Sequence, residues 1–274
     1  MSNPPIKKKL TNLHRVIKWY DHYAPEYDAD YKEDYWRIYD DLTWFGVEPY
    51  LPVEKSIPIM DIGGGTAKWA IKLAEKGYYV ICTDISQGML DIANKKITER
   101  DYQDRITLQK SDIRSMPEFQ DNSFMLTLAL GDVISYAIDD DLAVQELFRI
   151  TKPGGFCIAS VDNKIEYIVN EIKSERWQRI ESLVDSNITN FFPKHPIKTY
   201  FPIELKNLFI KHGFRPIKMI GKPIFVPIIP KKVRKHKFKE FYDVLLNLEK
   251  KFCDHQDLIG YGGHIQIIAQ KPHI

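Results

Sequence analysis

Ile57-Pro58-Ile59-Met60-Asp61-Ile62-Gly63-Gly64-Gly65-Thr66 is the stretch that decides the fold. A short apolar run leads into an acidic residue, three consecutive glycines and a threonine at which a helix can begin. Glycine permits a tight turn and lets backbone N–H groups approach a ligand closely. Residues 67–76 then carry apolar side chains at helical spacing. The order strand, glycine turn, helix is typical of the first unit of a nucleotide-binding α/β sheet.

The next predicted strand also ends in an acidic residue. Residues 79–83 form a mostly apolar run that leads directly into Asp84. An acidic side chain at this place can accept hydrogen bonds from both ribose hydroxyls of an adenosine cofactor. The glycine turn and Asp84 together therefore favour a cofactor that carries adenosine.

The composition is that of an ordinary globular protein. The chain has 274 residues, of which 44% are hydrophobic and 28% charged, and its formal net charge of +2 is too small to indicate a polyanionic partner by itself. Cys82, Cys157 and Cys253 are far apart, which favours free thiols in a reducing compartment. We see no secretory signal and no apolar run of the roughly 20 residues that span a bilayer. We therefore expect a cytoplasmic protein without a membrane partner.

Strands and helices alternate from residue 57 to about residue 161. Apolar strand patterns at 79–83, 106–109, 124–130 and 156–161 are separated by helical patterns at 86–99 and 139–151. Further strands are expected at 215–220 and 263–269. This alternation predicts a parallel, doubly wound sheet.

Two segments depart from that alternation. Residues 13–50 are rich in tyrosine and tryptophan with helical phase, and we expect the helix to break at Pro25. Packing against the core is one interpretation of these rings, and lining a ligand cleft is the other. Residues 162–200 predict one long helix from 164 to about 184, followed by a polar segment that ends at His195.

Five short motifs follow one another along the core. In chain order they are Asp61–Ala67, Asp84–Leu90, Ser111–Ile113, Leu130–Asp132 and Arg149–Gly155, with a Tyr20-Asp21 and Tyr27-Asp28 pattern upstream. Together they resemble the class I S-adenosylmethionine (SAM) dependent methyltransferases of small-molecule type. One departure is Ala67, which stands at the third glycine of the family's first motif. The resemblance implies a Rossmann-like, mostly parallel seven-stranded sheet with a helical acceptor-side cap, and SAM as cofactor.

The resemblance also implies which residues contact SAM. Backbone N–H groups of Gly63, Gly64 and Gly65 would meet the methionine carboxylate, because a helix starts there. Asp61 would hold the ammonium group directly or through water, and Asp84 would accept from the ribose. Met89 would pack on the adenine, Asp112 would accept from its amine, and Ile113 would add a backbone contact. Further cofactor-contacting residues would be Tyr20, Tyr27, Ile85, Leu130 and Gly131. The alternatives are an ordinary tight turn for the glycines, a capping acid for Asp112 and core packing for Met89.

The methyl acceptor is poorly encoded, because methyl transfer needs mainly alignment and a dry pocket. The predicted catalytic residues are Asp132 and Tyr136, after the fourth strand, and His195. Loop capping is the alternative role for Asp132 and Tyr136, and a solvated loop for His195. Tyr20, Tyr23 and Tyr200 complete the acceptor-side candidates. The spacing of Asp254, His255 and Asp257 is not diagnostic of a metal, so we predict no metal site.

The motifs divide the chain into five segments. We expect a disordered basic tail over 1–12, lead-in helices that form a lid over 13–50, the SAM-binding core over 51–161, an acceptor-side insertion over 162–202, and the C-terminal part of the sheet with a basic helical insertion over 203–274. The last of these contains a basic run, 231–239.

A small-molecule methyltransferase is the predicted function, with transfer to an O, N or S atom. Lys68 stands where a nicotinamide-binding fingerprint needs glycine. The turn Gly131-Asp132-Val133 lacks the (Asn/Asp)-Pro-Pro-aromatic pattern of enzymes that methylate base amino groups, so nucleic acid is not the expected partner. Two alternatives remain: an RNA or protein methyltransferase that uses the basic run, or a non-catalytic SAM-binding protein. The oligomeric state is not encoded.

Overall fold

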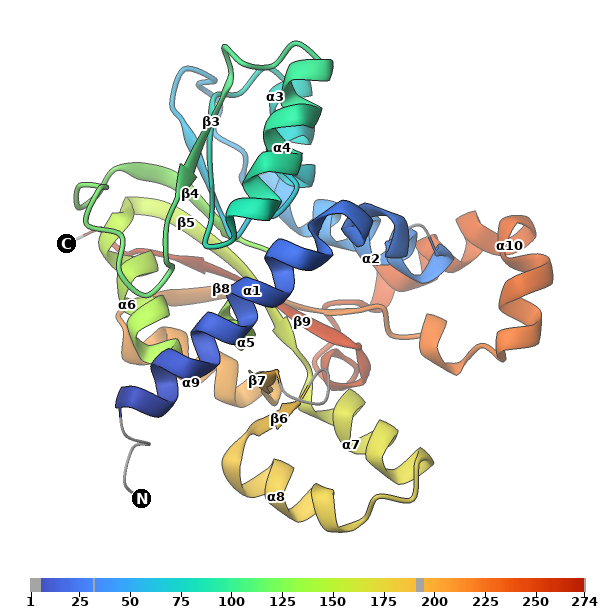
Figure 1. Ribbon diagram of the computed structural model, residues 1–274. Coiled ribbons are helices and arrows are strands. Elements are labelled where there is room, and N and C mark those ends of the chain that lie inside the picture. The colour runs from blue at the N-terminus through green and yellow to red at the C-terminus, as the bar shows by residue number, and fades with distance from the viewer. Residues whose placement is uncertain (1–5, 32, 191–194, 274) are drawn as a thin grey trace.

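A seven-stranded sheet forms the centre of the computed structural model, which describes residues 6–31, 33–190 and 195–273 (Figure 1). Its strands are β1 (Ile59–Ile62), β2 (Val80–Asp84), β3 (Ile106–Lys110), β4 (Phe124–Ala129), β5 (Thr151–Asp162), β8 (Arg215–Lys222) and β9 (His264–Gln270). They lie in the order β3-β2-β1-β4-β5-β9-β8. Strand β9 is antiparallel to both neighbours, and the pairs among β1 to β5 are parallel. The predicted Rossmann-like, mostly parallel sheet is confirmed.

Helices cover both faces of this sheet, because its central strands are apolar on both sides. One face carries α2 (Asp34–Val47), α3 (Lys68–Glu75), α4 (Gln87–Glu99) and α10 (Lys231–Phe252). The other face carries α5 (Val133–Ala137), α6 (Asp140–Ile150) and α9 (Pro202–Lys211). Short 3₁₀ turns occur at η1 (Glu48–Tyr50), η2 (Val226–Ile228) and η3 (Ile259–Tyr261).

The strand order reverses next to β1, which fixes the position of the site. Strand β1 pairs with β2 on one side and with β4 on the other. The loop after β1 leads to α3 on one face, and the loop after β4 leads to α5 on the opposite face. In open α/β sheets, ligands bind beyond the carboxyl ends of the strands at such a reversal.

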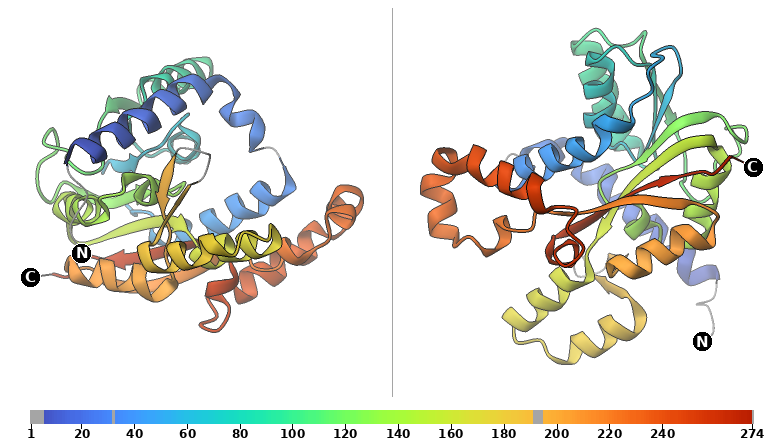
Figure 2. Two further views of the ribbon diagram at one scale, coloured as in Figure 1. Left: turned by 60° about the horizontal axis from the view of Figure 1, so that its bottom comes forward. Right: turned by 180° about the vertical axis from the view of Figure 1, so that it is seen from behind.

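Helix α1 (Ile6–Asp30) lies across this end of the sheet, as Figures 1 and 2 show in blue. It begins at Ile6, within the segment 1–12 that we expected to be a basic tail, and residues 1–5 lie outside the described residues. It also continues through Pro25, where we expected a break. Proline removes one backbone N–H, but Asp21 and Asp28, on either side of it, are both tied to the core by hydrogen bonds.

The segment after β5 forms two helices, not the single long helix predicted from 164 to about 184. Helix α7 (Lys164–Lys173) ends where Glu175 adopts a left-handed φ of 56°, and α8 (Gln178–Ser186) follows. Arg176 Nε donates to Glu171 Oε2 at 2.6 Å and secures the turn between them. The apolar periodicity continues across the break, which is why the two helices resembled one. Strands β6 (Ile188–Asn190) and β7 (Pro196–Lys198) then pair as a small antiparallel ribbon.

The basic run lies within the first turns of α10, which packs mainly on α2 and carries Phe238 and Tyr242 into the core. Within the described residues, no helix combines the length and the apolar character needed to cross a bilayer.

Candidate functional site

The glycine turn after β1 is held in a conformation that needs glycine. Gly63 and Gly65 have φ values of +63° and +56°, where L-side chains are strained. A Cβ on Gly63 would lie 2.4 Å from Val133, and one on Gly64 would lie 2.5 Å from the Cys82 sulfur. The turn is therefore closely packed on the loop after β4 and on β2.

Two of the three N–H groups predicted to meet a ligand carboxylate are already used inside the protein. Gly64 N–H donates to the Thr83 carbonyl and Gly65 N–H donates to Asp84 Oδ2, both at 2.9 Å. These bonds hold the turn against the end of β2. In this arrangement a ligand can come close to the backbone of the turn, but two of the three N–H groups are not free to donate to it.

Asp84 lies at the end of β2, beside the glycine turn. Its Oδ1 accepts from Ser86 N–H at 2.8 Å, and its Oδ2 accepts from Gly65 N–H. Burial raises the pKa of this carboxyl to about 6, although the two N–H groups favour its ionised form. Each oxygen keeps a lone pair for a further donor.

Asp61 lies beneath the turn and is almost fully buried. Neither of its carboxylate oxygens has a hydrogen-bond partner among the described residues, and burial raises its pKa to about 7. A Cβ on Gly64 would lie 2.8 Å from Asp61 Oδ2. A buried carboxylate without a partner raises the free energy of the folded state. A cation bound nearby would lower it.

A narrow cavity of about 90 Å³ opens beside the turn. Most of the predicted cofactor residues line it, together with one predicted catalytic residue: Tyr20, Tyr27, Gly63, Gly65, Asp84, Ile85, Met89, Asp112, Ile113, Gly131 and Tyr136. Asp112 is paired with Arg114, whose Nη2 lies 2.6 Å from Asp112 Oδ2. Arg114, which we did not predict, also lines this cavity.

Helix α1 closes one wall of the narrow cavity with Tyr20 and Tyr27. Asp21 Oδ1 accepts from Ser86 Oγ at 2.6 Å and from Gly88 N–H at 2.9 Å, at the start of α4. Asp28 accepts from Thr66 Oγ1 at 2.6 Å and from Lys96 Nζ at 2.7 Å. These two carboxylates fix α1 over the glycine turn and over α4.

A wide cavity of about 390 Å³ adjoins the narrow one. The two share the lining residues Tyr20, Tyr27, Gly63, Gly65, Gly131 and Tyr136. Gly64, Leu130 and Asp132 line the wide cavity, as do aromatic side chains of the N-terminal segment: Tyr31, Trp36 and Tyr39. Its lysines at the glycine-turn side are paired, Lys68 with Asp40 and Lys96 with Asp28.

Residues 59–155 match the family model described as Methyltransferase domain. These residues form a methyltransferase domain of the class I SAM-dependent kind. It is therefore a transferase, and SAM is its cofactor.

Curated relatives of this methyltransferase act on different acceptors, to judge by their names. The tRNA 5-carboxymethoxyuridine methyltransferase of Escherichia coli (strain K12) is 22% identical over 222 residues, which cover 80% of this chain and 81% of that enzyme. A demethylmenaquinone methyltransferase of Streptomyces avermitilis is 31% identical over 144 residues, which cover 52% of this chain and 58% of that enzyme. The solved structure of the cyclase SpnF has a TM-score of 0.66 at 18% identity, covers 94% of this chain and 96% of that one, and shows the fold alone.

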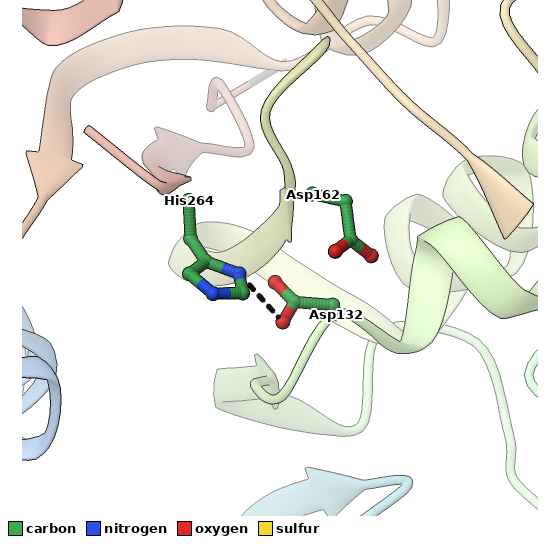
Figure 3. A group of neighbouring side chains, drawn as sticks. All are labelled: Asp132, Asp162 and His264. Carbon is green, nitrogen blue, oxygen red and sulfur yellow. Dashed lines mark ion pairs between the residues drawn. The ribbon is translucent and has the colours of Figure 1, made fainter. Parts of the chain in front are cut away.

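Three polar side chains of the methyltransferase lie side by side in Figure 3, and all three line the wide cavity. They are Asp132 after β4, Asp162 at the end of β5 and His264 at the start of β9. His264 Nδ1 lies 2.9 Å from Asp132 Oδ2, an ion pair and not a well-aligned hydrogen bond. Burial and the nearby Asp132 charge raise the pKa of Asp162 to about 7. Burial alone would lower the pKa of His264, but the two carboxylates raise it.

Asp162 and His264 were not among the predicted site residues. Asp162 directly follows the apolar run of β5, and the rule that ligands bind at the carboxyl ends of strands could have identified it. His264 carries no such signal, because it opens a strand that runs in the opposite direction.

Other predicted residues of the methyltransferase lie outside the two cavities. His195 packs against Trp19, with ring centroids 5.5 Å apart, and burial lowers its pKa. The Tyr200 hydroxyl donates to Asp140 at 3.0 Å, and the Tyr23 hydroxyl donates to Asp30. Neither cavity is lined by His195, Tyr23, Tyr200 or Asp61.

Proposed function

We propose that this methyltransferase transfers a methyl group from SAM to an O, N or S atom of a small molecule held in the wide cavity. The observation that carries the proposal is the cavity itself. Its volume of about 390 Å³ lies within the range of small-molecule sites, about 300–1,000 Å³. It is walled by aromatic rings and adjoins the glycine turn.

The residues present fit SAM. Asp84 has free lone pairs for the ribose hydroxyls. The unpartnered Asp61 carboxylate suits the methionine ammonium group. Because Asp61 does not line either cavity, a water molecule would connect the two. Met89 and Ile113 offer apolar surface to the adenine. When bound, SAM supplies an electrophilic methyl group on its sulfonium centre.

The chain contributes alignment and exclusion of water. Burial raises the pKa values of Tyr20, Tyr27 and Tyr136 well above the ordinary value, so these rings are neutral walls. The hydroxyls of Tyr20 and Tyr136 hydrogen-bond to each other and can instead orient a polar acceptor. Holding two reactants in line in a dry pocket supplies much of the rate enhancement of such a transfer.

The test is a methylation assay with SAM carrying a labelled methyl group. A cell extract is separated into a small-molecule fraction and a macromolecular fraction, and each is incubated with the protein. We expect label in low-mass products, and much less with Asp84→Ala at a SAM concentration that does not saturate the variant. Label that appears in RNA or in protein, with none at low mass, would contradict the small-molecule acceptor.

One observation favours a second candidate, an RNA acceptor. The E. coli relative is named as a tRNA methyltransferase and aligns over most of this chain, and the exposed Lys232 and Lys239 belong to the basic start of α10. RNA binding through such cations weakens steeply with salt. An electrophoretic shift of tRNA that is lost between about 50 and 200 mM salt, together with label in tRNA, would support this candidate.

A further inference from the structure

Asp132, Asp162 and His264 form a compact cluster of possible metal ligands. One ligand atom from each residue lies within 4.8 Å of the others, and the three groups point toward one another (Figure 3). They come from three separate places in the chain, the loop after β4, the end of β5 and the start of β9. All three line the wide cavity.

The backbone holds these side chains in place before any ligand binds. Asp162 and His264 are direct partners across the antiparallel β5–β9 pair, and paired side chains lie on the same face of a sheet. Asp132 has a left-handed φ of 66°, which is uncommon for a residue with a side chain. It precedes α5, yet its side chain makes no capping hydrogen bond to that helix. Its carboxylate faces His264.

The cluster lacks enough internal partners. Asp132 Oδ1 and Asp162 Oδ2 have no hydrogen-bond partner among the described residues, and the two carboxylates are only 7% and 4% exposed. His264 Nδ1 lies against the other oxygen of Asp132, at 2.9 Å. Buried charges in proteins are paired or coordinate metals, because an isolated one is very costly. The Tyr167 hydroxyl donates to Asp162 Oδ1 at 2.9 Å, which leaves Oδ2 free. Such an outer hydrogen bond is a common way to orient a metal ligand.

A nearby lysine interacts with Asp132 through its charge, but its hydrogen bonds go to residues outside the cluster. Lys222 is fully buried behind the cavity wall, but its Nζ donates to Thr43 Oγ1 at 2.5 Å and to Gln266 Oε1 at 2.6 Å. Protonated His264 would offset only one of the two carboxylates. The position that remains suits a cation from solution.

We propose that Asp132, Asp162 and His264 bind one divalent transition-metal ion on the acceptor side of the site. Two carboxylates and one imidazole suit ions such as Mn²⁺ or Zn²⁺. Three protein ligands on one wall, with the cavity opposite, leave coordination positions open, as in catalytic metal sites. An acceptor oxygen bound there would be oriented and polarised by the metal. This site goes beyond the proposed function, since methyl transfer by itself needs no metal.

Metal binding tests the site without SAM or acceptor. The full-length protein is treated with a chelator and titrated with Mn²⁺, and the loss of the free-ion EPR signal is followed. We expect one tight site per chain, from which Zn²⁺ displaces Mn²⁺. Asp162→Asn and His264→Gln should each weaken Mn²⁺ binding by at least about tenfold. His255→Gln is the matched control, because His255 is half exposed and lies 3.9 Å from an exposed Asp257. It should bind Mn²⁺ as the unmodified protein does.

Two results would overturn the proposal. One is that the unmodified protein binds neither Mn²⁺ nor Zn²⁺ more tightly than His264→Gln does. The other is that Asp162→Asn and His264→Gln bind Mn²⁺ with unchanged affinity. A SAM titration of each variant, which we expect to resemble that of the unmodified protein, shows that the variant is folded. Because the acceptor is not needed, failure of the metal site is distinguishable from failure of the small-molecule assay.

Discussion

Asp84 illustrates how one side chain can organise both the protein and a ligand. Its two oxygens accept from Ser86 and Gly65 N–H groups, so it closes the glycine turn against the end of β2. Asp84 also lines the narrow cavity, so its remaining lone pairs are available to a ligand there. A carboxylate fixed in this way by the backbone loses little freedom when it accepts hydrogen bonds from a ribose.

Replacing Asp84 should therefore weaken SAM binding. Hydrogen bonds to a charged group contribute about 1.5–3 kcal/mol, so we expect Asp84→Ala to reduce SAM affinity roughly tenfold to a hundredfold in isothermal titration. The melting temperature should also fall, because two N–H groups of the turn lose their acceptor. Asp91→Ala, at an exposed position on α4, is the control and should change neither. Unchanged SAM affinity in Asp84→Ala would mean that Asp84 has only the structural role.

Residues close together in sequence were easier to predict than those brought together by the sheet. Asp61, the glycines and Asp84 belong to one local unit, and their spacing alone places them. His264 reaches Asp132 only because β9 inserts between β5 and β8 and runs antiparallel. No local pattern encodes that insertion, so this part of the site could not be predicted from spacing.

At the scale of elements, α1 is the part of the site that lies outside the sheet and its flanking helices. It is tied through Asp21 to the start of α4 and through Asp28 to Thr66 and Lys96. Burial alone would raise the pKa of Asp21, but the hydrogen bonds from Ser86 and Gly88 lower it overall. The position of α1 over the site therefore depends in part on a few polar contacts, which one substitution can disturb.

Gly88→Ala should loosen α1 without harming the core. An added Cβ would lie 2.7 Å from the Asp21 carbonyl oxygen, so α1 must move away. Gly88 is the second residue of α4, where alanine is no worse a helix former than glycine, so the core should still unfold in one cooperative transition. We expect weaker SAM binding and faster proteolysis within residues 6–30. Gln87→Ala, at the neighbouring exposed position, should behave like the unmodified protein. Unchanged SAM affinity and protease resistance in Gly88→Ala would show that α1 does not close the site.

Element boundaries were less predictable than element types. Helix α1 passes through Pro25 because the hydrogen bonds of Asp21 and Asp28 to the core outweigh one missing backbone hydrogen bond. These are tertiary contacts, which the local sequence does not reveal. The break between α7 and α8 depends on a left-handed Glu175 and on the Arg176–Glu171 ion pair. Neither feature changes the apolar periodicity, which is the signal that a sequence offers.

At the scale of the whole molecule, the site is built at a cost in stability. Asp61 is buried and Asp84 is half-buried, and their pKa values are raised to about 7 and about 6. A carboxyl whose folded pKa is raised binds protons more tightly in the folded state, so stability falls as pH rises from the unfolded pKa of about 4 to the folded value. His264, with a raised pKa, acts in the same direction near neutral pH. Lys222, whose pKa burial lowers to about 7, opposes this trend only above that pH.

This leads to a prediction for the chelator-treated protein between pH 5 and 7. Without ligand, its melting temperature should fall as pH rises through this window, by about 2–4 °C for each kcal/mol lost. SAM should bind the ionised form of Asp84. SAM affinity should therefore increase as the pH rises, while the melting temperature of the unliganded protein falls. With a free-protein pKa of about 6, the ionised fraction of Asp84 increases about tenfold from pH 5 to pH 7, and SAM affinity should increase by about the same factor. The gap between the melting temperatures with and without SAM should therefore widen with pH. In Asp84→Ala that widening should be reduced. A gap that stays constant in the unmodified protein would show that SAM does not bind the ionised carboxylate.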